Sequence, residues 1–222
     1  MTTDSRTPDP GHRAPDNDPE SPTPSLRIRP IAADDASQVD EILHKVSIFY
    51  NFEIIVAMEL INEALKGNDD YIVHVAEWTS GDVIARSEAT KYPRPDRGAL
   101  LRQPLPGQAQ SFPDPDPDPG FKKPVVGYVC FGHNPMTDAL YDLYWIAVHP
   151  KAQGTGVARA LLTHTEREVK KLRGRGVIIE TSGRAEYEPA KRLYEACGYA
   201  RVAEIPDFYK PGDPRLIYLK LL

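Results

Sequence analysis

The residues with the clearest chemical signal are Gly154 and Gly156, which stand between an apolar run and a helical pattern. The run at residues 140–148 is nearly all apolar, and Pro150 ends it. Glycine adopts backbone conformations closed to other residues, so a turn here exposes consecutive amide groups. With the positive end of the following helix, these amides predict a cradle for an anion such as a diphosphate. An ordinary strand–turn–helix connection is the alternative interpretation.

Two other phosphate-binding motifs fit these residues badly. A P-loop needs a lysine and then serine or threonine after its last glycine, whereas Val157 and Ala158 follow Gly156. A dinucleotide-binding fingerprint needs a third glycine, and Arg159 occupies that position. Neither motif is favoured.

The periodicity of apolar residues predicts the elements that position this loop. Helices are expected at residues 36–46, 54–65, 157–172 and 189–197, with Asp34 or Asp35 as N-cap of the first. Strands are expected at 26–31, 71–78, 83–85, 125–131, 140–148, 177–181, 201–205 and 216–221. This order predicts a mixed α/β fold with a parallel step around each crossover helix. The apolar run at 140–148 belongs at the sheet centre.

Proline-rich segments lie outside this pattern. Residues 1–25 contain almost no large apolar side chain, so a disordered tail is expected there. Residues 87–124 include an alternating Pro-Asp run and are expected to form an extended, solvated insertion. Aspartates between the prolines suit an SH3- or WW-type ligand poorly. The remainder of residues 26–222 is predicted to form a single domain.

Composition excludes several classes of protein. The chain has 27 Lys+Arg against 32 Asp+Glu, a net charge of −5, which gives no field to hold a nucleic acid. Its 2 cysteines make no disulfide framework or thiolate metal site. We find neither a membrane-spanning apolar run nor the apolar stretch of a secretory signal. A cytoplasmic protein with no membrane partner is predicted.

Two motifs resemble those of a known enzyme family. Residues 153–158, Gln-Gly-Thr-Gly-Val-Ala, are similar to the Q/R-x-x-G-x-G/A signature of the GCN5-related N-acetyltransferases, the GNAT family. Residues 190–199 resemble the family's second signature, A-x-x-L/F-Y-x-x-x-G-F/Y, and residues 143–150 resemble its fourth strand. The resemblance covers residues 26–222 without the insertion. One position departs from the pattern, since Tyr187 stands where the family usually has asparagine.

The resemblance implies a splayed, mixed sheet of about six or seven strands flanked by about four helices. It also implies that acetyl-coenzyme A binds between the fourth and fifth strands. The pyrophosphate is then expected on the amides of Gln153, Gly154, Thr155, Gly156, Val157, Ala158 and Arg159. The pantetheine is expected along the backbone of Ile146, Ala147 and Val148, where an N–H also polarises the thioester carbonyl. Tyr187 is counted with these cofactor-binding residues.

Acetylation of an amine needs a base for the incoming ammonium and a proton for the departing thiolate. The resemblance gives the second role to Tyr194, for which a core tyrosine is the alternative. Glu180 is the first choice as base, because it ends a predicted strand where α/β sheets display functional groups. Asp142 is the second choice. Its carboxylate lies in the apolar run at 140–148, where burial without a partner would cost free energy. Alternatively, either carboxylate is only a structural hydrogen-bond acceptor, and a chain of water molecules takes the proton from the ammonium.

Other residues are assigned supporting roles or none. Aromatic residues and the loop at 206–214 are expected to frame the acceptor site, with core packing as the alternative: Phe49, Tyr50, Phe52, Phe208 and Tyr209. His149 precedes Pro150 at the cofactor loop and is assigned no catalytic role. Cys130 and Cys197 are expected to be small buried hydrophobes rather than nucleophiles. No metal site is predicted.

The sequence therefore predicts an acetyl-CoA-dependent N-acetyltransferase that acts on a primary amine of a small molecule or peptide by direct attack. A non-catalytic acyl-CoA-binding sensor or scaffold is the alternative. A third interpretation makes the proline-rich segments the working parts of an interaction protein. Dimers are common in the family, so a homodimer is also an expectation. The sequence does not identify the acceptor amine.

Overall fold

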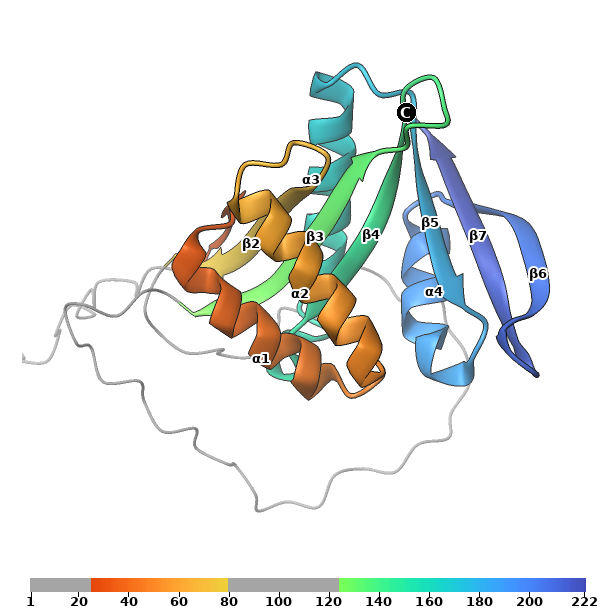
Figure 1. The fold of residues 1–222 in the computed structure, drawn as a ribbon, viewed down its shortest axis with the longest axis horizontal. Helices are drawn as coiled ribbons and strands as arrows, with labels where there is room; N and C mark the ends of the chain where they lie inside the picture. Colours follow the sequence, from red (N-terminus) through yellow and green to blue (C-terminus); the bar gives the residue numbers. More distant parts are fainter. Residues whose placement is uncertain (1–24, 80–123) are drawn as a thin grey trace, which may run out of the picture.

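The computed structural model describes residues 25–79 and 124–222 (Figure 1). Almost all of the predicted tail at 1–25 lies outside these ranges, as do the predicted strand at 83–85 and nearly all of the predicted insertion at 87–124.

Seven described strands form one mixed sheet in the order β1-β2-β3-β4-β5-β7-β6. They are β1 (Leu26–Pro30), β2 (Ile72–Trp78), β3 (Val125–His133), β4 (Leu140–Val148), β5 (Gly176–Ser182), β6 (Ala200–Lys210) and β7 (Asp213–Leu221). Strands β4 and β5 are parallel, and the other neighbours are antiparallel. The predicted mixed α/β fold is confirmed, and the apolar run at 140–148 is the central strand.

Four α-helices cover the sheet within the described residues: α1 (Ala36–Val46), α2 (Asn51–Leu65), α3 (Val157–Lys171) and α4 (Glu188–Ala196). Helices α1 and α2 lie in front of β2, β3 and β4 in Figure 1, with α3 behind them. Helix α3 joins the parallel pair β4 and β5, as predicted. Helix α4 likewise joins two strands of the same direction, because β5 and β6 are both antiparallel to β7, which lies between them.

Some element boundaries differ from the predicted ones for local reasons. Helix α2 begins before Ile54 because the Glu53 carboxylate accepts a hydrogen bond from the Tyr50 amide at 2.7 Å and caps the helix. The predicted loop at 206–214 is largely strand, since β6 extends to Lys210 and β7 begins at Asp213. Pro206 is tolerated there because β6 is an edge strand.

Both faces of the central sheet are buried, which explains its continuous apolar runs. On β3, Val126, Val129 and Phe131 pack into the core beneath α3. Their neighbours Val125, Tyr128 and Cys130 pack into the core beneath α1 and α2. Cys130 is buried as predicted, whereas Cys197 is only half-buried because it follows the last turn of α4.

Strand β4 contains an extra residue at Tyr144. Trp145 lies opposite Cys130 on β3, and Leu143 lies opposite the next residue, Phe131. Tyr144 is therefore the bulged residue of a β-bulge. Consistent with this, Tyr144 and Trp145 both pack beneath α1 and α2, which breaks the normal alternation of a strand. The pairing of β4 with β5 ends at Leu143, so the strands separate where the bulge begins (Figure 1).

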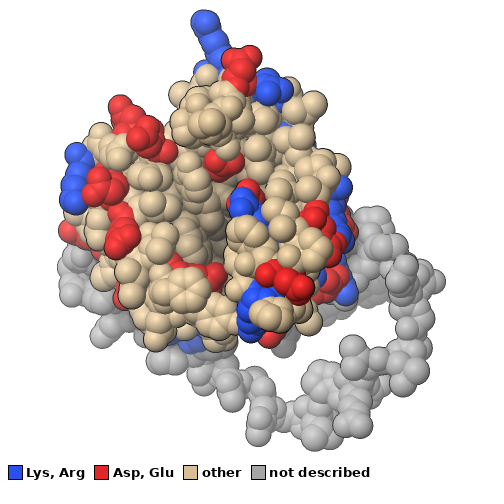
Figure 2. All heavy atoms as spheres, turned by 45° about the vertical axis from the view of Figure 1, so that its right-hand side comes forward, with Lys and Arg blue, Asp and Glu red and all other residues tan. Residues whose placement is uncertain are grey.

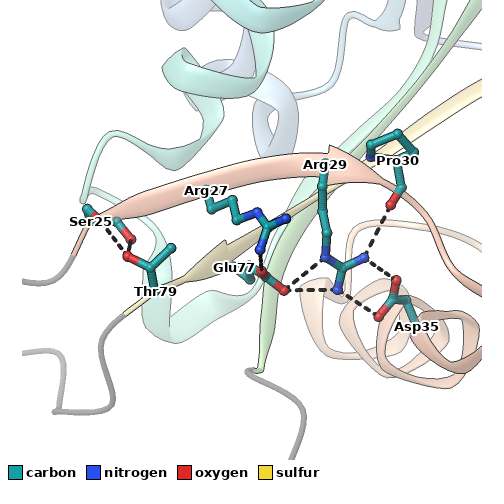
Figure 3. Close-up of polar contacts among 7 residues, drawn as sticks. All are labelled: Ser25, Arg27, Arg29, Pro30, Asp35, Glu77 and Thr79. Atoms are coloured by element: carbon teal, nitrogen blue, oxygen red, sulfur yellow. Dashed lines mark hydrogen bonds and ion pairs between the residues drawn. The ribbon is translucent and has the colours of Figure 1, made fainter.

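An ionic network attaches β1 to the rest of the fold (Figure 3). Arg29 donates hydrogen bonds to Asp35 at 2.6 and 3.0 Å and to Glu77 at 3.0 and 2.9 Å. Both carboxylates are buried, and their contacts raise the pKa of Arg29, with Asp35 contributing most. Asp35 is the N-cap residue of α1 as predicted, but its side chain makes no capping hydrogen bond to that helix. The short helix η1 (Ala33–Asp35) instead directs its carboxylate to Arg29 and to the Ala32 amide.

We predict that Arg29→Ala lowers the free energy of unfolding by about 3–5 kcal/mol, because two buried carboxylates lose their cation. Urea denaturation followed by circular dichroism measures the change. Arg27→Ala is the matched control, since Arg27 approaches the same Glu77 at 3.7 Å but is 61% exposed. The control loss is expected to stay below about 1 kcal/mol. Equal losses in the two variants would contradict the importance assigned to the buried network.

A pair of histidines joins β2 to α3. The Nε2 atom of His164 lies 2.9 Å from the Nδ1 atom of His74, a hydrogen bond in which one ring must be neutral. His74 is only 8% exposed. Burial, and secondarily the nearby His164, lowers the pKa of His74 to about 4, and burial also lowers the pKa of His164. On α3, the charge of Glu168 raises the pKa of His74, whereas the charge of Lys171 lowers it.

We predict that this pair destabilises the fold as the pH falls from about 6.5 to about 4. The pKa of His74 in the folded chain is below its ordinary value of 6.5, so the neutral ring favours folding above that pH. This contribution is lost as the ring gains a proton on approach to pH 4. Carboxylates also titrate here, so the measurement compares wild type with His74→Gln in urea melts at each pH. A constant difference between the two proteins across the window would refute the prediction.

Candidate active site

The loop between β4 and α3 has the backbone geometry predicted for an anion cradle. A short helix η2 (Pro150–Ala152) follows β4. Gly154 and Gly156 then adopt φ values of 79° and 91°, in the left-handed region that favours glycine. The Gly156 carbonyl accepts the hydrogen bond of Ala160 at 3.0 Å. The amides of residues 157–159 therefore precede the first N–H donor of the helix, that of Ala160, and are available at its N-terminus.

Side chains hold this loop in place without filling its outer side. Gln153 Nε2 donates to the Val148 carbonyl at 3.3 Å, and Thr155 Oγ1 donates to the Ala152 carbonyl at 2.6 Å. A Cβ atom added at Gly154 or Gly156 would meet no atom within 4 Å. The first turn of α3 carries no acidic residue. An anion at this place can therefore bind the amide donors and the positive end of the helix, and no carboxylate in the first turn repels it.

His149 belongs to this loop rather than to a reactive centre. Its Nδ1 atom accepts a hydrogen bond from the Lys151 amide at 3.2 Å. Burial lowers the pKa of its ring. The residue thus orders the turn that leads from β4 into the cradle.

A cavity of about 870 Å³ lies where β4 and β5 separate. Phe52 and Val56 of α2 line it on one side of the sheet. Ala190 and Tyr194 of α4 also line it, and both pack against the core on the opposite side, beneath α3. The cavity therefore passes through the sheet at the split. The face drawn in Figure 2 is hollowed between two lobes, and acidic and basic side chains both lie around the hollow.

The structure brings most of the residues singled out in the sequence to this cavity. Its lining includes Tyr194, Glu180, Asp142, Tyr187 and Ile146, together with Phe49, Tyr50, Phe52 and Tyr209. Ala147 and Val148 continue β4 from Ile146 toward the cradle at 153–159. Phe208 is not part of the lining and packs over the guanidinium of Arg215, at 4.7 Å from ring centre to Cζ.

Tyr194 is held rigidly at the α4 side of the cavity. Its side chain is 4% exposed, and its ring meets that of Tyr218 edge-on at 5.6 Å. Burial raises the pKa of Tyr194 above its ordinary value. Its hydroxyl therefore keeps its proton at neutral pH and can act as a donor.

The two candidate bases face the opposite side of the sheet. Val177 and Ile179 of β5 pack beneath α3, so Glu180 projects toward the α1 and α2 side. Glu180 forms an ion pair with Arg215 and is part-exposed. Asp142 is half-buried, and burial raises its pKa, while a hydrogen bond with Asn134 acts in the opposite direction. Proton donor and candidate bases thus lie on different sides of the split.

The sequence analysis missed a group of charged and aromatic residues at the open end of the cavity. The Arg184 Cζ atom lies 4.9 Å from the ring centre of Tyr50 and 5.2 Å from that of Tyr187. Arg184 also forms a 3.5 Å ion pair with Asp213, which is buried and accepts a hydrogen bond from Ser182 Oγ at 2.5 Å. The available signal was the position of Arg184, two residues after the end of β5, where α/β sheets display functional groups.

Within residues 25–79 and 124–222, no group of three or more His, Cys, Asp or Glu residues could hold a metal ion. No helix there has the length and apolar character needed to cross a membrane.

Comparisons with known proteins agree with this fold and cavity. Residues 121–201 match the family model described as the acetyltransferase (GNAT) domain. A structure from Desulfovibrio desulfuricans, described as a GNAT-family acetyltransferase, is 28% identical, with a TM-score of 0.66. The match covers 89% of this chain and 99% of that one. A search of curated proteins returns no match. The chain is therefore similar to GNAT acetyltransferases, in sequence over residues 121–201 and in its overall fold.

More distant structures share the fold. A protein of Salmonella typhimurium solved with its cofactor acetyl-CoA is 18% identical, with a TM-score of 0.55, over 89% of this chain and 94% of that chain. The ribosomal-protein-S18-alanine N-acetyltransferase of Escherichia coli is 15% identical, with a TM-score of 0.55 and the same coverage of 89% and 94%. These matches support the predicted splayed, mixed sheet.

Proposed function

We propose that this protein is an acetyl-CoA-dependent N-acetyltransferase that acetylates a primary amine of a small molecule or peptide by direct attack. The observation that carries the proposal is the cavity through the split between β4 and β5, at the end of β4 that leads into the amide cradle. The match of residues 121–201 to the GNAT acetyltransferase domain and the acetyl-CoA in the Salmonella typhimurium structure support it.

The residues around the split fit a coenzyme A thioester. The diphosphate would bind the amides at residues 153–159, where added Cβ atoms at both glycines meet only open space. The pantetheine would pair with Ile146, Ala147 and Val148, because β4 no longer pairs with β5 beyond Leu143. Acetyl-CoA supplies the activated acetyl group. Tyr187 would add a phenol at the start of α4, where the GNAT pattern usually has an asparagine side chain.

The proposed proton transfers use the two sides of the split. Glu180 would accept the proton of the incoming ammonium on the α1 and α2 side, with Arg215 holding its carboxylate in place. Asp142 is the second candidate, since its raised pKa brings it closer to the working pH of a general base. Tyr194 would supply a proton to the departing thiolate from the α4 side. Because base and acid face different sides of the sheet, they do not exchange protons directly.

Two measurements test this function. Calorimetric titration of coenzyme A into the protein is expected to give a saturable heat. Mixing the protein with acetyl-CoA and a panel of primary amines is expected to release free thiol. Absence of CoA binding would refute the proposal. CoA binding without transfer to any amine would instead favour a non-catalytic acyl-CoA-binding protein.

We predict that Gly156→Asp weakens CoA binding at least about tenfold, because a carboxylate would enter the space next to the amide donors and repel the diphosphate. Isothermal titration calorimetry measures the dissociation constant. Gly67→Asp is the matched control, since Gly67 also has a positive φ, of +89°, and open space around it, but lies at the end of α2. Both variants carry similar backbone strain. Similar affinities for CoA in the two would count against the cradle.

We predict that Tyr194→Phe lowers kcat at least about tenfold while the affinity for CoA changes little, because only the proton donor is removed. Steady-state kinetics and titration with CoA separate the two quantities. Tyr199→Phe is the control, since its ring lies in the same core, 6.4 Å from that of Tyr194, but does not line the cavity. Parallel losses of turnover and affinity would make Tyr194 a packing residue.

A further inference from the structure

The open end of the cavity carries a cluster that the proposed proton transfers do not use. Tyr50 Oη accepts hydrogen bonds from Arg184 Nη1 at 2.8 Å and from Lys210 Nζ at 3.0 Å. Both cations also lie over the Tyr50 ring, at 4.9 and 5.6 Å from its centre. Arg184 Nη2 donates to the Ile48 carbonyl at 3.1 Å, which fixes its guanidinium. We refer to Tyr50, Arg184 and Lys210 as the cationic cluster.

Ion pairs cancel most of the charge that lines the cavity. Arg184 is paired with Asp213, and Arg215 is paired with Glu180. The Glu53 carboxylate caps α2, where the positive helix end offsets its charge. Within the part of the chain that the structure describes, Lys210 and Asp142 then remain without a salt bridge. Apart from Glu53, which is held at the start of α2, the unpaired charges among the described lining residues are therefore one cation and one carboxylate.

These opposite charges lie toward opposite ends of the cavity. Asp142 is in register with Ile178 on β5, at the closed end of the split. Further along β5 toward the open end lie Glu180 and then Ser182. The Ser182 hydroxyl donates a hydrogen bond to Asp213. Lys210 is in register with Asp213 at the open end. Since Glu180 and Ser182 are two residues apart on one strand, about 7 Å separate the candidate base from the start of the open end.

The Tyr50 hydroxyl accepts from two cations and keeps a proton that it can donate to a ligand. A neutral phenol has a single proton, and a hydroxyl oxygen that accepts from two cations must direct that proton elsewhere. Tyr50 is 39% exposed and lines the cavity. A carboxylate could accept from this hydroxyl and from the Lys210 ammonium together, as a charge-assisted pair. A second cation at the same place would be repelled.

We infer that the acceptor is a free amino acid with an apolar side chain. Its carboxylate binds Tyr50 and Lys210, and its amino group lies toward Glu180 and Asp142. Phe52 and Val56 of α2, which are 65% and 45% exposed, provide an apolar wall for the side chain. This inference rests on the proposed function and names its substrate class. An amine without a neighbouring carboxylate, such as a peptide N-terminus or a polyamine, leaves the Lys210 charge uncompensated.

The test compares amino acids with their amides, which have the same side chain but lack the carboxylate. L-leucine, L-methionine and L-phenylalanine, and the amide of each, are titrated into the full chain saturated with CoA, and the fluorescence of Trp145 in the cavity wall reports binding. At least one acid is expected to bind about tenfold more tightly than its amide. If no acid binds more tightly than its amide, the inference is overturned.

Variants of the cluster add a second readout. Lys210→Met is expected to weaken binding of the acid about tenfold and to leave binding of the amide unchanged, and Tyr50→Phe is expected to act in the same direction. Lys66→Met, at the exposed end of α2, is the control and is expected to change neither. Equal effects of Lys210→Met on acid and amide would overturn the inference.

Transfer assays separate this inference from the proposed function. Acetyl transfer to amides and simple amines without any preference for a free carboxylate would overturn the inference and leave the acetyltransferase function standing. Absence of CoA binding would refute the proposed function, and this inference with it. Acetylation of one of these amino acids in preference to its amide would support both.

Discussion

The loss of backbone pairing between β4 and β5 beyond Leu143 is the constraint on which the rest of the site depends. Buried N–H and C=O groups need partners, and leaving one unpaired costs about 1–3 kcal/mol. The extra residue at Tyr144 keeps β4 paired with β3 but turns it away from β5. The central strand thus has an edge within the sheet, and a ligand that pairs like a strand would satisfy its polar groups.

The same separation determines which side chains can reach the reacting atoms. Because β4 and β5 alternate their side chains between two cores, Asp142 and Glu180 belong to the α1 and α2 side, whereas Tyr194 approaches from α4 on the other. An enzyme that removes one proton and supplies another benefits from this arrangement, since its acid and base are kept apart by the sheet. In the proposed function, the bulge would therefore position the acid and base as well as the cofactor.

The sequence predicted the features that depend on local patterns. The helix at 36–46 and the strand at 140–148 match α1 and β4, and the glycine loop has the predicted backbone conformation. The bulge at Tyr144 was not predicted, because apolar residues run through β4 without a visible change of period. The cationic cluster was missed because Tyr50 is separated from Arg184 by 134 residues and from Lys210 by 160. Asp35 likewise suits an N-cap locally, but Arg29 on β1 draws its carboxylate into the ionic network that Arg29 also forms with Glu77.

Tyr187 connects the departure from the family pattern to the charges at the acceptor end. Its ring lies 5.2 Å from Arg184, which in turn lies over Tyr50, so the guanidinium packs against two aromatic rings. Burial raises the pKa of Tyr187 to about 12, which keeps the phenol neutral beside this cation. An asparagine at the same position has no ring and would remove one of the two faces that hold Arg184. The tyrosine therefore supports the cationic cluster, and it links α4 to the side of the cavity where the proposed function places the acceptor.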